Sequence, residues 1–306
     1  MKSSHKNILI SVSLVIGFGL LLSTILITLK GKTIALTLNE KIGMVFVEGP
    51  IMDSRAIVEE ISSLRKDNQI KAILIRVDSP GGGVGPSQEI YQEIQRTKVL
   101  KPVVVSMGSL AASGGYYISA AATKVVANPG TITGSIGVIV EFVRFQRLMD
   151  KIGLDLDVVK MGEFKDMGSP HRPLTDNEKE MLLKVLEDIH SQFVTDVAKG
   201  RGIEEEKIKQ LADGRIFSGK EAKELGLVDE LGNLQDAIEI TKELAGIKGE
   251  PQLVMPKKKR RLLDVLFEEI TQRIIVAIYR LKQETSILNS YNNSLPLFIL
   301  PQLRTY

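Results

Sequence analysis

The sequence contains no cysteine, no tryptophan and only three histidines among its 306 residues. Without cysteine, the chain forms no disulfide, holds no cysteine-bound zinc or iron–sulfur cluster, and has no thiol nucleophile. The histidines, His5, His171 and His190, are too few and too scattered for a multi-histidine metal site. We therefore expect no metal centre.

A strong charge of either sign is also lacking. Forty lysines and arginines oppose 37 acidic residues, and a net charge of +3 is too weak to favour nucleic acid as a partner. Hydrophobic residues make up 43% and charged residues 25%, as in soluble globular chains. The composition therefore excludes a disordered chain and a polytopic membrane protein, and the length fits one large domain or two small ones.

One long run has no charge at all. Residues 7–29 are rich in isoleucine, leucine and valine. As a helix rising about 1.5 Å per residue, this run would be about 34 Å long, enough for a ~30 Å hydrocarbon layer. No Ala-x-Ala cleavage site follows, so we predict an uncleaved transmembrane anchor. Lysines flank both ends, and the positive-inside rule therefore orients the anchor only weakly.

Beyond residue 41, apolar strand-like runs alternate with helical patterns. This alternation predicts an α/β fold with a parallel sheet and crossover helices. The strands are expected at residues 42–47, 72–77, 102–107, 124–127 and 156–161, and helices at 89–97 and 113–122. Capping boxes then begin at Thr175 and Ser218, and Gly200 and Gly202 should end the first of these two helices. His190 lies within that helix and is expected to be a packed or surface residue.

The composition changes again near the C-terminus. Residues 257–261 are five consecutive cations, typical of a solvated linker or of contact with anionic lipid head groups. Residues 262–282 have apolar side chains at helical spacing, which fits packing on a neighbouring subunit or binding to a membrane surface.

Two glycine-rich segments could carry chemistry. Residues 78–83 read Asp-Ser-Pro-Gly-Gly-Gly directly after a predicted strand. A phosphate-binding loop is disfavoured, because the segment lacks the Gly-Lys-Ser/Thr of the Walker pattern. An oxyanion hole, in which backbone N–H groups face a developing negative charge, and an ordinary glycine turn both remain open.

The second segment, residues 107–117, places Ser113 between a strand and a helix. Ser113 could be a helix N-cap, or a nucleophile whose oxyanion is stabilised by the Gly114 N–H and the helix dipole. The Gly-x-Ser-x-Gly elbow of α/β hydrolases is not matched, because Ala111 stands at its first glycine.

A serine nucleophile needs a base. His171 lies in a turn, and Lys165 is the alternative. A lysine is ordinarily protonated at neutral pH and becomes a base only where burial without a counter-charge disfavours its charge. We therefore expect Asp166 to face away from Lys165.

These segments resemble the signal peptide peptidase A (protease IV) family of membrane-anchored serine peptidases. The motifs follow in the family's order: Ser-Pro-Gly-Gly-Gly, Gly-Ser-x-Ala-Ala-Ser-Gly-Gly-Tyr-Tyr, Gly-Thr-Ile-Thr-Gly-Ser-Ile-Gly-Val, Gly-x-x-Lys-x-x-Gly-Ser-Pro, and later Arg-Ile-Phe-Ser-Gly and Gly-Leu-Val-Asp. The resemblance covers residues 41–248. It implies a Clp-protease/crotonase-like α/β fold of stacked ββα units.

The resemblance also assigns roles. Ser113 matches the nucleophile, and Lys165 matches a general base that replaces the His-Asp pair of Clp-type proteases. Ser135 matches a serine that holds the lysine amine. The sequence departs from the family at Asp166 and Met167, where small residues are more common.

Gly82 and Gly114 match the residues whose N–H groups form the oxyanion hole. The glycine run leaves Gly81 and Gly83 as alternatives to Gly82.

The resulting expectation is an anchored Ser/Lys endopeptidase that forms an acyl-enzyme, needs no cofactor, and degrades cleaved signal peptides and similar apolar peptides. Long family members hold the lysine and the serine on different copies of the domain. This single-copy chain is therefore expected to form a homo-oligomeric ring that shares the dyad between subunits. A crotonase-like acyl-thioester enzyme and a non-catalytic membrane scaffold are the alternatives.

The expected segments are a cytoplasmic N-terminus (1–6), an anchor (7–29), a linker (30–40), an extracytoplasmic peptidase domain (41–248), a basic linker (249–261) and a helical tail (262–306).

Overall fold

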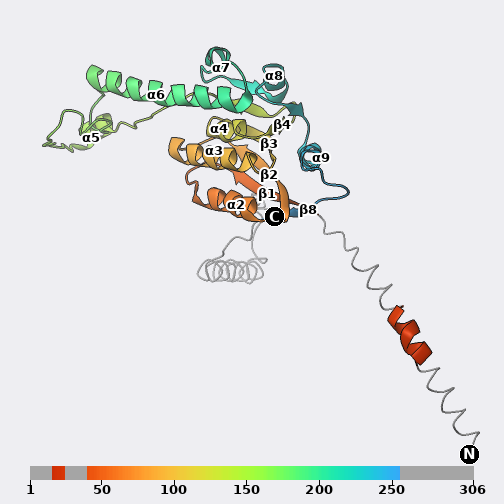
Figure 1. The fold of residues 1–306 in the computed structure, drawn as a ribbon. Helices are drawn as coiled ribbons and strands as arrows, with labels where there is room; N and C mark the ends of the chain where they lie inside the picture. Colours follow the sequence, from red (N-terminus) through yellow and green to blue (C-terminus); the bar gives the residue numbers. More distant parts are fainter. Residues whose placement is uncertain (1–15, 25–39, 256–306) are drawn as a thin grey trace, which may run out of the picture. The chain divides into compact units, whose positions relative to one another are not determined.

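The computed structural model describes residues 16–24 and 40–255 (Figure 1). Residues 16–24 form a helix, and within the described ranges no helix is long and apolar enough to cross a membrane. The predicted anchor at 7–29 extends beyond those ranges on both sides, so it stays a prediction. The tail at 262–306 lies outside the described residues.

The sheet is built around two long, buried parallel strands. These are β2 (Ile70–Ser79) and β3 (Val103–Ala112), whose apolar residues are buried on both faces. The order is β6-β5-β3-β2-β1-β8, with β4 beside β3 and β7 beside β4. Only the β5–β6 pair is antiparallel among the described pairings. The remaining strands are β1 (Lys41–Glu48), β4 (Lys124–Ala127), β5 (Ile132–Gly134), β6 (Ile216–Ser218), β7 (Glu230–Leu231) and β8 (Gln252–Val254).

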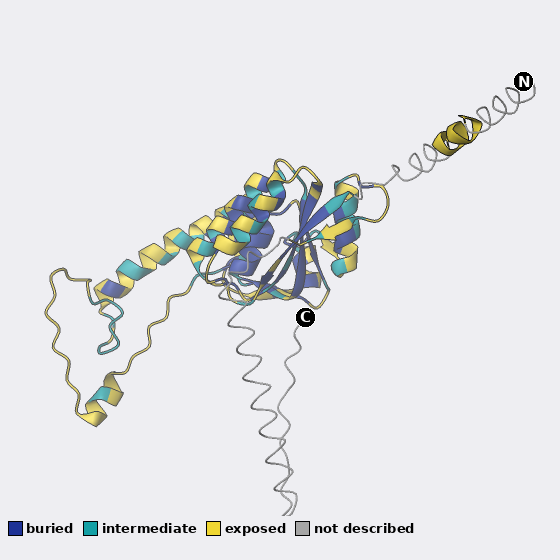
Figure 2. Cartoon of the chain, turned by 90° about the horizontal axis from the view of Figure 1, so that it is seen from below, coloured by how far each residue is buried: buried dark blue, intermediate teal, exposed yellow. Residues whose placement is uncertain are grey.

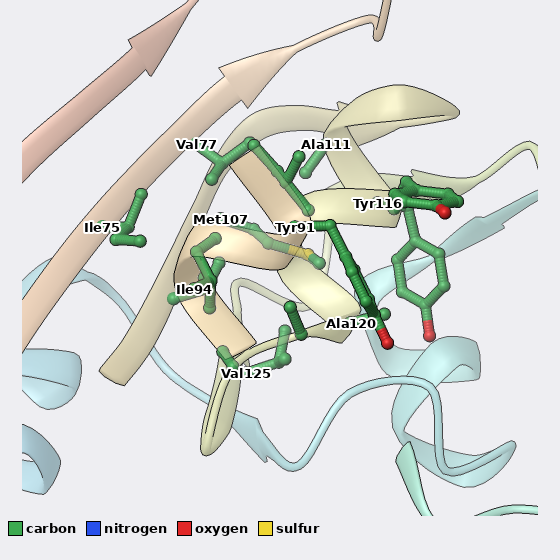
Figure 3. Close-up of a cluster of buried hydrophobic side chains, with 14 of the residues drawn as sticks. Ile75, Val77, Tyr91, Ile94, Met107, Ala111, Tyr116, Ala120 and Val125 are labelled. Atoms are coloured by element: carbon green, nitrogen blue, oxygen red, sulfur yellow. The ribbon is translucent and has the colours of Figure 1, made fainter. Parts of the chain in front are cut away.

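Helices cover both faces of this sheet, as parallel strands require. One face packs against α2 (Arg55–Lys66), α3 (Val84–Lys98), α4 (Gly114–Ala120) and α6 (Asp176–Arg201) in a single apolar core. Figure 3 shows Ile75, Val77 and Met107 of the strands meeting Ile94 of α3 in this core. Leu74 and Val104 point to the opposite face and contact α9 (Leu234–Leu244).

The predicted α/β fold is confirmed, and the strands expected at 42–47, 72–77, 102–107 and 124–127 correspond to β1 to β4. The strand predicted at 156–161 is wrong. These residues are exposed and belong to no strand, although the apolar pattern resembles one.

Residues 156–161 lie in a long connecting segment, residues 137–175, which leaves the sheet after β5 and ends at the start of α6. We call it the arm; its one helix is α5 (Gln146–Ile152). Figure 2 shows most of the arm as exposed.

The helix α6 begins as predicted and ends differently. Thr175 and Glu178 form the predicted capping box. Gly202, with φ of +65°, ends the helix, whereas Gly200 lies inside it. A Cβ on Gly200 would lie 2.2 Å from the carbonyl oxygen of Ala120, so this glycine allows α6 to approach the end of α4. The helices α7 (Glu205–Leu211) and α8 (Gly219–Glu224) follow, and the Ser218 hydroxyl caps α8 by accepting from the Glu221 N–H.

Candidate active site

The candidate nucleophile lies where the central strand β3 turns into α4. The register of β2 and β3 shifts just before this point, and the Asp78 carboxylate accepts the N–H groups of Ser109 and Leu110 that the shift leaves unpaired. Ser113 then has φ of +52° and ψ of −121°, a conformation that is costly for a residue with a side chain. Asp78 thus supports the bend that leads the chain into this strained residue.

Ser113 occupies the N-cap position of α4, but its side chain makes no capping hydrogen bond. Its backbone is fixed on both sides: its N–H donates to the Gly134 carbonyl at 2.9 Å, and its carbonyl accepts the Tyr117 N–H at 2.8 Å. In the described part of the chain its hydroxyl has no hydrogen-bond partner. The N-cap interpretation therefore fails, and the hydroxyl remains free for chemistry.

The glycine run beside Ser113 leaves one N–H without an acceptor. The Gly81 N–H donates to the Ser79 hydroxyl at 3.1 Å, and the Gly83 N–H donates to the Ile51 carbonyl at 2.9 Å. The Gly82 N–H has no acceptor among the described residues. The geometry therefore favours Gly82 over its two neighbours as an oxyanion donor.

The glycine run and the start of α4 are in close contact. A Cβ on Gly81 would lie 2.5 Å from the Gly114 nitrogen and 2.9 Å from the Ser113 Cβ. A Cβ on Gly114 would lie 3.2 Å from the Gly82 nitrogen. The first N–H groups of a helix have no intrahelical acceptor, so the Gly114 N–H is available as well. Two amides beside a free hydroxyl match the requirements of an oxyanion hole.

A small cavity of about 30 Å³ opens beside these groups. Its walls include Ser113 and both candidate amides, but most of its side chains are apolar. They come from α3, α4, the arm and α6: Val84, Tyr117, Val138, Ile189 and Phe193. Such a cavity fits an uncharged, apolar side chain next to the bond under attack.

Ser135 lies next to Ser113 because β3 and β5 pair at Ala112 and Gly134. It too has a positive φ of +52°, and its N–H donates to the Arg215 carbonyl at 2.8 Å. In the described residues its hydroxyl has no partner. The structure thus brings together Ser113, Gly82, Gly114 and Ser135.

Lys165 is not part of this group. It lies exposed on the arm, and the carboxylate of its neighbour Asp166 binds Arg172 at 2.8 Å. Arg172 in turn binds Glu178, in the first turn of α6, at 2.5 Å. The cavity begins at Ile189 of the same helix, eleven residues further on. At about 1.5 Å per residue, roughly 16 Å of helix separates the two points.

The anchoring of the arm is electrostatic. Hydrogen bonds from Arg172 hold the pKa of Asp166 well below its ordinary range, and Lys160 adds to the effect. Arg172 and the Thr175 N–H lower the pKa of Glu178 to about 2. The Asp166 carboxylate contacts Arg172 and Lys160.

The two histidines among the described residues do not offer an alternative base. His171 lies in the arm, with Nδ1 3.1 Å from the Met149 sulfur. His190 contacts the Ala212 carbonyl through Nε2 at 2.7 Å, as expected for a packed residue. Neither lines the cavity at Ser113. Within residues 16–24 and 40–255, no cluster of side chains could hold a metal ion.

Sequence reasoning missed the residues that shape the cavity. Tyr117 lies one helical turn after Ser113, and Ile189 and Phe193 are one turn apart on α6. Helical spacing marks these residues as packed, but only the tertiary structure brings α4 and α6 together around one cavity. Asp78 was visible as the first residue of the glycine-rich segment, yet its role in the bend depends on the register shift of β3.

A free serine hydroxyl beside two free amides, on an α/β sheet of mostly parallel strands, is typical of serine peptidases with a Clp-like fold. Comparison supports this class, since residues 31–131 match the model of the Clp protease family. Residues 95–248, half of the chain, match the model of peptidase family S49.

Individual relatives agree. The Synechocystis protein slr0021, named as a protease, is 42% identical over 211 residues, which cover 68% of this chain and 76% of the relative. The protein MJ0651 of Methanocaldococcus jannaschii, also named as a protease, is 36% identical over 78% of this chain and 80% of its own length. The chloroplastic serine protease SPPA of Arabidopsis thaliana is 36% identical over 67% of this chain and 30% of its own length. The chain belongs to peptidase family S49 and is a serine protease of the signal peptide peptidase type.

Proposed function

We propose that this protein is a membrane-anchored endopeptidase that degrades cleaved signal peptides and similar apolar peptides, with Ser113 as its nucleophile. One observation carries the proposal: a strained serine with a free hydroxyl lies between two free backbone amides and an apolar cavity. Apolar segments such as signal peptides would supply the side chains that this cavity accepts.

The mechanism follows from the positions of these groups. The Ser113 hydroxyl oxygen attacks the peptide carbonyl carbon, and its proton passes to a neutral lysine amine. The carbonyl oxygen becomes negative and is held by the N–H groups of Gly82 and Gly114. The amine product leaves with the proton, and a water molecule activated by the lysine hydrolyses the acyl-enzyme.

We propose Lys165 of a neighbouring subunit as this lysine, with Ser135 accepting a hydrogen bond from its amine. The ion pairs of Arg172 support this assignment, because they hold Asp166, next to Lys165, at Glu178, and about 16 Å of helix separates Glu178 from Ile189 at the cavity of the same chain. A neighbour's arm reaching the cavity would make a head-to-tail contact, and such contacts close into a ring. The contact would also bury Lys165, which a lysine base requires.

Residues 7–29 are proposed to anchor the protein, with residues 1–6 in the cytoplasm and the peptidase domain outside. The chain has no cysteine, so a single Glu205→Cys substitution at an exposed position gives a unique label. An impermeant maleimide should label this variant on intact cells. Labelling only after lysis would reverse the proposed orientation.

The activity is tested with a fluorophosphonate probe and a defined signal peptide. The probe should label the wild-type protein but not Ser113→Ala, and mass spectrometry should find cleavage after apolar residues only with the wild type. Labelling that persists in Ser113→Ala would reject the nucleophile. Thioester turnover without any labelling would favour a crotonase-like enzyme instead.

A further inference from the structure

A second, polar hollow adjoins the cavity at Ser113. It lies between α3 and α6 and is lined by glutamines, hydroxyl side chains and the carboxylate of Asp196. The two hollows share two residues, Gln88 and Tyr117. The wall between an apolar cavity and a polar, anionic one therefore consists of these two side chains.

Tyr117 is fixed in this wall by contacts on three sides. Its hydroxyl donates to the Asp196 carboxylate. Its ring meets Tyr91 edge-on at a centroid distance of 5.1 Å and lies 4.7 Å from the ring of Phe193. Burial, together with Asp196, raises the pKa of Tyr117 well above its ordinary range, so the phenol keeps its proton and donates it. Tyr117 is 5% exposed.

Gln88 closes the rest of the wall. Its side-chain amide donates to the Gln192 side chain at 2.9 Å, and the Gln192 amide donates to Asp188 at 3.0 Å. This chain of amides joins α3 to α6 beside the Tyr117 ring. The Asp196 carboxylate thus lies behind the wall, on the side away from Ser113.

We propose that Tyr117 and Gln88 determine which substrates are cleaved, because they close the floor of the cavity and keep Asp196 out of it. The proposal rests on the proposed role of Ser113, because the side chain entering this cavity belongs to the residue whose carbonyl is attacked. With the wall in place, small and medium apolar side chains fit, whereas a long cation meets an aromatic ring. Without the wall, a long cation reaches Asp196 and pairs with it.

The experiment compares peptides that differ only at the cleaved residue: alanine, leucine, phenylalanine and lysine. The wild type should prefer alanine and leucine. Tyr117→Ala should raise the kcat/KM for phenylalanine and lysine at least tenfold relative to that for alanine. In Tyr117→Ala with Asp196→Asn, the gain for phenylalanine should persist and the gain for lysine should disappear.

Two further variants separate specificity from stability. Ile94→Ala removes a fully buried side chain of α3 that lines neither hollow, so it should leave the order of preference unchanged. Gln88→Glu keeps the size of the side chain and adds a charge to the wall. It should fold normally and raise cleavage after lysine severalfold, which tests the proposal even if Tyr117→Ala does not fold.

The outcomes distinguish the two proposals. Cleavage by Ser113→Ala would reject the proposed nucleophile, whatever the results for the Tyr117 and Gln88 variants. A second outcome is cleavage that depends on Ser113 and yet shows the same preferences in Tyr117→Ala and Gln88→Glu as in the wild type. That result would reject the proposed role of Tyr117 and Gln88 in specificity. An equal shift in Ile94→Ala would reduce the effect to general loosening of the core and also overturn the proposal.

Discussion

Ser113 and Ser135 are the two residues other than glycine with positive φ in the described part of the chain, and they are neighbours. Unfavourable backbone conformations of this kind cost about 1–3 kcal/mol each and persist only where the surrounding structure enforces them. Here the enforcing contacts are the backbone hydrogen bonds from Ser113 to Gly134 and from Ser135 to Arg215. The strained backbone at Ser113 and Ser135 thus lowers the stability of the fold at the candidate active site.

This strain predicts that losing the serine stabilises the fold. Ser113→Gly should abolish peptidase activity and raise the free energy of unfolding by about 1–2 kcal/mol, because glycine adopts positive φ freely. Ser113→Ala, which keeps a Cβ, should abolish activity with little change in stability. Urea unfolding of the three proteins measures the difference, and equal stabilities for glycine and alanine would contradict the strain.

Close packing around the candidate oxyanion hole makes a second prediction. Gly81 has φ of +97°, and a Cβ there would collide with Gly114 and Ser113. Gly81→Ala should therefore destabilise the fold by about 1–3 kcal/mol and lower kcat at least a hundredfold, since it displaces a candidate oxyanion donor.

Gly85→Ala is the matched control for this substitution. Gly85 lies four residues away, in the first turn of α3, with nothing within 4 Å of an added Cβ. Alanine is favoured there by helix propensity, so stability should stay equal or rise by up to about 1 kcal/mol with activity unchanged. Matching losses in both variants, measured by unfolding and by peptide cleavage, would contradict the packing argument.

Among the elements, the arm depends on α6 for its position. Arg172 binds both Asp166 of the arm and Glu178 in the first turn of α6. Both carboxyl groups have lowered pKa values in the folded state, so their contribution to stability is present above the pKa of the unfolded chain and is lost as pH falls through the folded value. For Glu178 this window extends from about 4.5 in the unfolded chain down to about 2.

The arm should therefore detach on acidification before α6 itself unfolds. Hydrogen exchange of residues 160–172 should accelerate as pH falls from 4.5 toward 2, after correction for the intrinsic pH dependence of exchange. Arg172→Gln should cause the same acceleration at pH 7. Lys184→Gln, which removes only an exposed ion pair with Glu180 on the same helix, should not. Unchanged protection of the arm in Arg172→Gln would show that other contacts hold it.

The arm also marks the limit of what the sequence could predict. The buried strands β1 to β4 were recognisable because apolar runs and turn residues report burial directly. The glycine run and the segment of Ser113 were recognisable because each follows a strand end, whereas Ser135 and the choice of Gly82 came from the family resemblance. Residues 156–161 have the same β-branched pattern but are exposed and belong to no strand, and a local pattern cannot distinguish an exposed apolar segment from a buried strand.

At the scale of the whole molecule, the arm exposes many apolar side chains. In the arm Ile139 is 80% exposed, Val143 68% and Met161 96%, and Val159 is fully exposed. Soluble chains rarely leave so many apolar side chains in water unless another surface covers them. The proposed partner is a second copy of this chain, because no base lines the candidate site among the described residues and the arm carries Lys165. The interface would then join the arm of one subunit to the cavity of the next.

This arrangement predicts that two inactive chains restore each other. Ser113→Ala lacks the nucleophile and Lys165→Ala lacks the base, so each assembly alone should be inactive. Coexpressed in equal amounts, they should recover roughly a quarter of the wild-type activity, because one neighbouring pair in four then combines an intact Ser113 with an intact Lys165. A dyad within one chain would recover none.

Peptide cleavage is measured on particles isolated through different tags on the two chains, with particles built from Ser113→Ala alone as the control. Absence of activity in particles shown to contain both variants would mean that Lys165 does not serve a neighbour's serine.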